Sequence, residues 1–261
     1  NTSGQYSVAI GNDALGANTT GNNNTSVGAD SLRTNTGGGN NTALGSSALY
    51  TNTASDNTAV GRHSMLNNTT GTRNTAVGAQ AMDNNTTGNY NVAVGSNQCL
   101  GANTTGGYNV AIGDGAMVTN TTSSFCVAIG QAALYSNTAA NQTAVGYAAM
   151  MDNSTGTDNV AVGNLAMRYN TTGYNNVAIG FEALDTNTTT DKNIAIGYQS
   201  LKTNAADSNT AVGHQTLRSN SSGSLNVALG LEPLYNNTSG IRNIGIGAPA
   251  LYQNTTGGYN V

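Results

Sequence analysis

Short apolar triplets recur along this chain about every seventeen residues, separated by polar stretches rich in Asn, Thr and Gly. Examples are Val8-Ala9-Ile10, Thr75-Ala76-Val77 and Ile194-Ala195-Ile196. The outer two positions are β-branched or aliphatic in every unit, and the middle one is Ala, Ser or Gly. This period of two residues predicts a short β-strand in each repeat.

A glycine follows the triplet in all fifteen complete repeats, and a Leu or Met follows four residues later in all but one of them. An invariant glycine predicts a corner that needs positive φ or close backbone approach. We expect the segment after it to return as a second short strand or extended side. The Val and Ile positions and the Leu or Met column are expected to point inward. The predicted corners include Gly11, Gly78, Gly113, Gly180 and Gly247.

Every repeat opens on Asn, and a second Asn stands at the seventh position of thirteen of the sixteen units. Because an amide both donates and accepts hydrogen bonds, identical amides can bond from one coil to the next. We therefore predict two asparagine ladders, the first of which includes Asn18, Asn68, Asn103, Asn170 and Asn237.

The repeat length varies by one residue in a few units. The units that open at Asn52, Asn137 and Asn204 have sixteen residues and lack the glycine of the first turn, whereas the unit from Asn85 has eighteen. A turn of variable length lies on the surface, so the neighbouring columns are expected to stay in register.

These patterns predict an all-β fold: a parallel β-solenoid, or β-roll, of about sixteen coils of seventeen residues, spaced ~4.8 Å apart. The period is too short for a helical repeat. Residues 1–261 are expected to form a single repeat domain, and since the chain begins and ends inside the repeat, we interpret it as a fragment of a longer array.

The Ala column of the strands is expected to face away from the Val and Ile side and to leave an apolar stripe in water. We therefore predict that this stripe, or the alternate face, packs against further copies of the chain in a parallel homotrimer. The alternative is a thin solitary solenoid whose lumen takes the Ala side chains.

Composition narrows the function. Only 8% of the residues are charged and the net charge is −4. The Lys and Arg residues form no cluster for nucleic acid, and no apolar run is long enough for membrane insertion. Cys99 stands where Leu or Met is usual and Cys126 where Asn is usual, so no disulfide is expected.

Catalytic groups do not gather in the sequence. His63 and His214 are the two histidines, nine coils apart, and the carboxylates show no paired spacing. We predict no enzyme activity, no metal site and no cofactor.

Two surface columns remain as binding candidates. Tyrosines recur near the end of the repeat at Tyr50, Tyr135, Tyr235 and Tyr252, where they could dock on a host glycan or protein, although packing between coils explains them as well. Thr recurs at the second position of thirteen units, and such a hydroxyl ridge suggests ice binding as a less favoured function.

The segments Ser7-Val8-Ala9-Ile10-Gly11, Asn159-Val160-Ala161-Val162-Gly163 and Asn176-Val177-Ala178-Ile179-Gly180 resemble the head repeats of trimeric autotransporter adhesins, which form left-handed parallel β-rolls. Similar arrays occur in the shafts of phage tail fibres and in bacterial surface fibres. The adhesin repeats are shorter, because here an Asn-Thr-Thr-Gly turn lengthens each coil. The resemblance implies an extracellular location, on a cell surface or a virion fibre, and a role in display or attachment. A self-assembling extracellular filament is the alternative within the same class.

Overall fold

The computed structural model describes residues 3–261, so the predicted ladder residue Asn1 and the ridge residue Thr2 lie outside the described part. The contacts divide the chain into two compact units, unit 1 up to Gln131 and unit 2 from Ala132 to Val261. Each unit is a parallel β-solenoid with coils of about seventeen residues, and residues 3–261 contain no helix. The predicted fold class is therefore confirmed.

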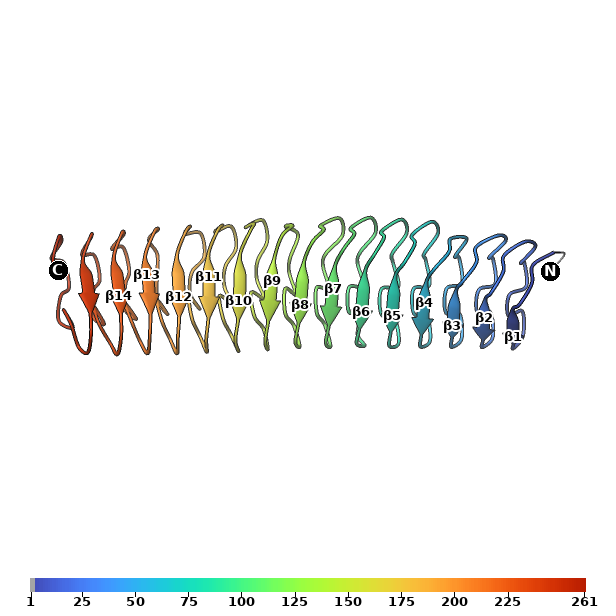
Figure 1. Ribbon diagram of the computed structural model, residues 1–261, viewed down its shortest axis with the longest axis horizontal. Helices are drawn as coiled ribbons and strands as arrows, with labels where there is room; N and C mark the ends of the chain where they lie inside the picture. Colours follow the sequence, from blue (N-terminus) through green and yellow to red (C-terminus); the bar gives the residue numbers. More distant parts are fainter. Residues whose placement is uncertain (1–2) are drawn as a thin grey trace. The chain divides into compact units, whose positions relative to one another are not determined.

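Unit 1 contains eight strands of three residues, each paired in parallel with the next one along the chain (Figure 1). Pairing is in register across coils of every length: Thr42 lies opposite Thr58, and Val92 opposite Val110. The strands are β1 (Val8–Ile10), β2 (Thr25–Val27), β3 (Thr42–Leu44), β4 (Thr58–Val60), β5 (Thr75–Val77), β6 (Val92–Val94), β7 (Val110–Ile112) and β8 (Val127–Ile129).

Unit 2 repeats this arrangement with seven strands, again each parallel to its successor. The sixteen-residue coil from Asn204 keeps Ile194 opposite Thr210, as a variable surface turn requires. The strands are β9 (Thr143–Val145), β10 (Val160–Val162), β11 (Val177–Ile179), β12 (Ile194–Ile196), β13 (Thr210–Val212), β14 (Val227–Leu229) and β15 (Ile244–Ile246).

The strands face the opposite way from our expectation. The middle Ala of each inner strand is buried, for example Ala76 and Ala178 at 0% exposure, whereas the flanking Val and Ile residues are half-buried or exposed. The predicted exposed Ala stripe is therefore wrong. Each coil is so thin that its lumen admits Ala from the strand together with one Leu or Met, such as Met82 or Leu184, from the return side.

The corner glycines have positive φ, as predicted: 132° at Gly11, 127° at Gly78, 130° at Gly113, 130° at Gly180 and 102° at Gly247. The return segment forms turns and contains no second strand, contrary to our expectation. Its Leu or Met column also has positive φ, for example 48° at Leu32. Hydrogen bonds to the next coil, such as Leu32 N to Ala48 O at 3.0 Å, hold this uncommon conformation.

Both predicted asparagine ladders are present. In the first, most side chains donate to the amide oxygen of the preceding coil, as from Asn85 Nδ2 to Asn68 Oδ1 at 2.7 Å and from Asn103 to Asn85 at 2.7 Å. Asn18, Asn170 and Asn237 belong to the same column within their units. The second ladder joins side chain to backbone: Asn74 Oδ1 accepts from Asn91 N, and its Nδ2 donates to Gly88 O.

Within the units, the first ladder is interrupted where a short coil begins. Asn52 Nδ2 donates to Ala54 O, and Asn204 Nδ2 to Ala206 O, and neither forms a described bond to the preceding asparagine of the column. At the second interruption, Thr190 occupies the turn position that is usually Gly. Its buried hydroxyl donates to Asn187 Oδ1 and accepts from Asn193 Nδ2 at 3.1 Å and Asn204 Nδ2 at 3.2 Å. One threonine thus reconnects the column.

We expect Thr190→Val to lower the free energy of unfolding by about 1–3 kcal/mol, because Asn193 Nδ2 loses its described acceptor inside the protein. Thr190→Ser keeps the hydroxyl and is the matched control. Urea denaturation of both variants measures the difference. Equal stability of the two would show that the hydroxyl does not reconnect the ladder.

The eighteen-residue coil changes the assignment of Cys99. The extra residue lies between Gly95 and Cys99, so Leu100 takes the buried Leu or Met position, and its amide donates to Ala116 O. Cys99 therefore replaces the small residue before that column, not Leu or Met as predicted. Burial raises the pKa of its thiol to about 11, which keeps it protonated and unreactive at neutral pH.

Candidate functional site

The four predicted binding tyrosines share one repeat position at the end of the return side, with Tyr50 in unit 1 and the other three in unit 2. Tyr50 and Tyr235 each lie beneath a guanidinium, that of Arg33 at 5.8 Å and that of Arg218 at 5.7 Å. Tyr235 also stacks on Tyr252, with centroids 5.1 Å apart and planes at 11°, and Tyr135 is 42% exposed. Since both faces of the Tyr235 ring are covered, a ligand would meet its edge and hydroxyl. The binding role of these tyrosines stays a prediction.

In unit 2 this tyrosine column continues into a network of charged and amide side chains. Arg168 binds both carboxylate oxygens of Asp185 at 3.2 and 3.3 Å, and Lys202 and Gln199 donate to Glu182. Gln199 in turn accepts from the Arg218 guanidinium at 3.0 Å. The network therefore links side chains across successive coils without leaving a charge free in a cleft.

The two carboxylates of the network respond differently to their surroundings. Burial would raise the pKa of Glu182, but hydrogen bonds from Lys202 and Gln199 and the nearby positive charges outweigh it, so the pKa is lowered. Burial raises the pKa of Asp185 more than Arg168 lowers it. Neither carboxylate is paired with a nucleophile, and both are explained as parts of the ion-pair network.

Stacked aromatic side chains form two further columns. Just before the strands of unit 1, Tyr90, Tyr108 and Phe125 stack at 4.8 and 5.2 Å. The second column, which we call the post-corner column, consists of the residues directly after the corner glycines of unit 2. In it, Phe181 stacks on Tyr198 at 5.4 Å, and Tyr198 on His214 at 5.2 Å. Our sequence analysis missed the post-corner column, although the same repeat position carries a ring in three consecutive coils.

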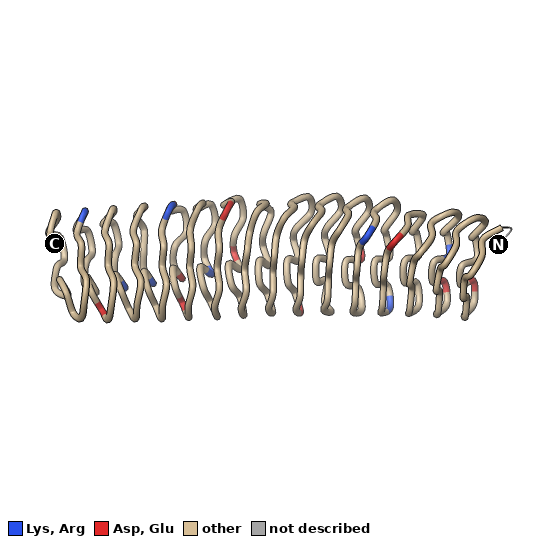
Figure 2. Tube along the Cα trace, in the orientation of Figure 1, with Lys and Arg blue, Asp and Glu red and all other residues tan. Residues whose placement is uncertain are grey.

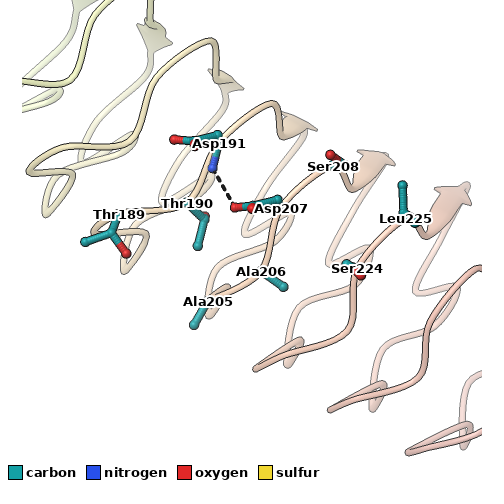
Figure 3. Close-up of a pocket in the computed structure, with 9 residues that line it drawn as sticks. All are labelled: Thr189, Thr190, Asp191, Ala205, Ala206, Asp207, Ser208, Ser224 and Leu225. Carbon is teal, nitrogen blue, oxygen red and sulfur yellow. Dashed lines mark hydrogen bonds between the residues drawn. The ribbon is translucent and has the colours of Figure 1, made fainter.

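A groove of about 590 Å³ opens where the short coil from Asn204 crosses the surface of unit 2 (Figure 3). Asp191 and Asp207 lie on its wall, and Asp207 Oδ1 accepts from Asp191 N at 2.9 Å. The other lining residues are Thr189, Thr190, Ala205, Ala206, Ser208, Ser224 and Leu225. The missing turn residue explains the groove, and each aspartate already accepts a backbone hydrogen bond, Asp191 from Tyr174 N.

The two histidines occupy different positions of the repeat. His63 belongs to unit 1 and is half-buried, and His214 of unit 2 is exposed and stacked on Tyr198. No group of three or more His, Cys, Asp or Glu side chains within residues 3–261 is arranged to hold a metal ion.

The threonines at the second repeat position form the predicted ridge, but their hydroxyls are engaged. Thr19 Oγ1 donates to Thr36 O at 2.9 Å, and Thr69 Oγ1 to Thr86 O at 2.9 Å. A ridge that orders water needs hydroxyls in a matching array, and here most of the donors are directed at a carbonyl of the next coil.

The outward face of the strands exposes apolar side chains in both units. In unit 2 its exposed members include Ile179, Ile194, Val227, Leu229, Ile244 and Ile246. Charged residues are few along the chain and are scattered (Figure 2). Within residues 3–261 there is no helix of the length and apolarity that a membrane span requires. Comparison with protein-family models and with curated proteins finds no match to this chain, so the adhesin resemblance stays a prediction.

Proposed function

We propose that this chain is a non-enzymatic structural segment of an extracellular fibre or adhesin head. Its role is to mediate display and attachment to a surface. The observation that carries the proposal is the outward strand face, where Val, Ile or Leu fills the second outer position of every strand and, except in the strands that begin with Thr, the first as well. Monomeric proteins rarely leave an apolar column of this length in water.

This face also supplies an interface between copies. Since the Ala stripe is buried, the alternate face, which carries the outward Val, Ile and Leu side chains, is the one available for a parallel homotrimer. Its exposed members have no charge among them, and they repeat at the spacing of the strands, so an identical rod matches them coil for coil.

We expect the purified chain to sediment with the mass of three copies. Replacing Ile179 and Ile194 by Glu would place charges in the interface and reduce the mass to that of one chain. Replacing the exposed Thr188 and Thr189 by Glu is the control, because these residues lie on the turn away from the strands. A wild-type mass of one chain would refute the trimer.

Electron microscopy of the native material separates the remaining alternatives. Rods of constant length fixed to a cell or particle support the fibre or adhesin, whereas unattached filaments of variable length support self-assembly. Thermal hysteresis of the protein in freezing solution would support the ice-binding alternative, which the engaged threonine hydroxyls disfavour.

A further inference from the structure

The post-corner column has a gap in an otherwise regular series of rings. In five consecutive coils of unit 2 it carries Tyr147, Asn164, Phe181, Tyr198 and His214. The last three rings stack with interplanar angles of 14° and 9°. Side chains at this position therefore project in the same direction, with their ring faces directed along the column. Asn164 is the only one of the five that is not a ring.

The backbone beneath the gap is continuous. Thr143, Val160 and Val177 pair in register, Leu165 N donates to Tyr147 O at 3.0 Å, and Glu182 N donates to Asn164 O at 3.1 Å. Two coil steps of ~4.8 Å therefore separate the positions of Tyr147 and Phe181 by roughly 10 Å. The two side chains are 52% and 39% exposed, and Asn164 between them is exposed as well.

The gap has room for one further ring. Rings of this column stack with centroids 5.4 and 5.2 Å apart, so a flat ring would also fit, and the amide at the base of the gap is what favours a ring that bears hydroxyl groups. A puckered sugar ring, with C–H groups on both faces, needs about 8–9 Å, at about 4.0–4.5 Å per contact. The Asn164 amide offers donors and an acceptor for hydroxyl groups at the base of the gap.

We propose that Tyr147, Asn164 and Phe181 form a saccharide clamp that binds one pyranose ring of an oligosaccharide. The two aromatic rings cover the faces of the sugar, and the amide binds its hydroxyl groups. The clamp gives the attachment role proposed above a ligand class, and its biological purpose rests on that role. Its geometry does not depend on that role.

The other aromatic columns cannot act in this way. Tyr90, Tyr108 and Phe125 occupy consecutive coils and stack directly, and Tyr235 and Tyr252 do the same. Ring centroids about 5 Å apart leave no room for a sugar between them. The clamp is therefore specific to the coil that carries Asn164.

Binding is tested with the full chain and four soluble probes: cellotriose and chitotriose for polysaccharide sources, and lactose and N-acetyllactosamine for glycoconjugate sources. We expect saturable binding of at least one probe in saturation-transfer NMR and calorimetric titration. Asn164→Phe fills the gap and continues the stack, so it should weaken binding at least tenfold while the protein stays folded. Phe181→Leu should weaken binding to a similar degree. Phe125→Leu in unit 1 is the matched control and should change the affinity less than twofold.

Two outcomes would overturn the clamp: failure of all four saccharides to bind the wild-type chain, or binding by folded Asn164→Phe as tight as that of wild type. Circular dichroism and thermal denaturation of each variant establish that it is folded. The mass and microscopy measurements on the fibre do not depend on sugar binding, so the clamp and the structural role can fail separately.

Discussion

Gly28→Ala is expected to lower the free energy of unfolding by about 4 kcal/mol or more. The φ of Gly28 is +132°, a region that an alanine occupies only under strain of about 1–3 kcal/mol. The new Cβ would also lie 2.6 Å from the carbonyl carbon and oxygen of Gly45 in the next coil. Coils at ~4.8 Å spacing have no freedom to move apart without losing their hydrogen bonds.

Gly247→Ala separates the two causes. Its φ is +102°, but a Cβ there meets no atom within 4 Å, so only the conformational strain applies. Urea denaturation of both variants should show a loss for Gly247→Ala of about 1–3 kcal/mol, clearly smaller than that for Gly28→Ala. A loss of the same size in both would mean that close packing of the corners contributes nothing.

Asn85→Asp is expected to destabilise the protein by about 3–5 kcal/mol at pH 7. Asn85 is fully buried, and its amide donates to Asn68 Oδ1 at 2.7 Å and to Gly88 O at 3.0 Å. A carboxylate has no hydrogen to donate, so two acceptors would face a buried negative charge. The ladder is built from donors and acceptors in equal number, and the substitution leaves only acceptors at one coil.

The loss should depend on pH in a defined direction. A buried carboxyl beside two acceptors has a folded-state pKa above its unfolded value of about 3.9, so the folded state binds the proton more tightly. The variant should therefore approach wild-type stability below about pH 4 and lose it as the pH rises. Asn23→Asp, at an exposed position of unit 1, is the control and should show little change. A pH-independent loss at Asn85 would contradict the buried-charge account.

Much of the fold could be predicted because the repeat itself reports it. An Asn or Gly present in nearly every unit occupies the same place in every coil, and the structure confirms the corners, the strands and both ladders at those positions. Stacking identical coils turns a weak local preference into a column of identical bonds. Even the omitted residue of the short coils was placed correctly, since the strands on either side of it stay in register.

The direction of the strands was predicted wrongly because the space left on the strand side of the lumen, and not hydrophobicity, decides which strand residue is buried. Val and Ile are more apolar than Ala, so the pattern favours placing them inside. The lumen, however, already holds a Leu or Met such as Leu49 and has room only for Ala43 opposite. The turns of the return side escaped prediction for a related reason: Leu32 and Met82 adopt positive φ, which their residue types disfavour.

Of the candidate site, the sequence indicated a column of tyrosines but not what covers their faces. Stacking is a relation between coils, so it emerges only when residues are compared at equal positions in successive repeats. Phe181 and Tyr198 show this, because each looks like an isolated surface aromatic in the linear sequence.

The two coils of unusual length near Asn52 and Asn85 have a consequence for how such a gene can change. An in-frame loss of one codon in the turn after the opening asparagine keeps the following strand in register, as the pairing of Thr42 with Thr58 shows. The gain of one codon after the corner glycine does the same, as the pairing of Val92 with Val110 shows. The same change within a strand would move the buried side chains that follow it to the surface and the exposed ones into the lumen. Codon insertions and deletions in descendants of this sequence should therefore accumulate at those two turns. Selection should remove them from the strand between the turns.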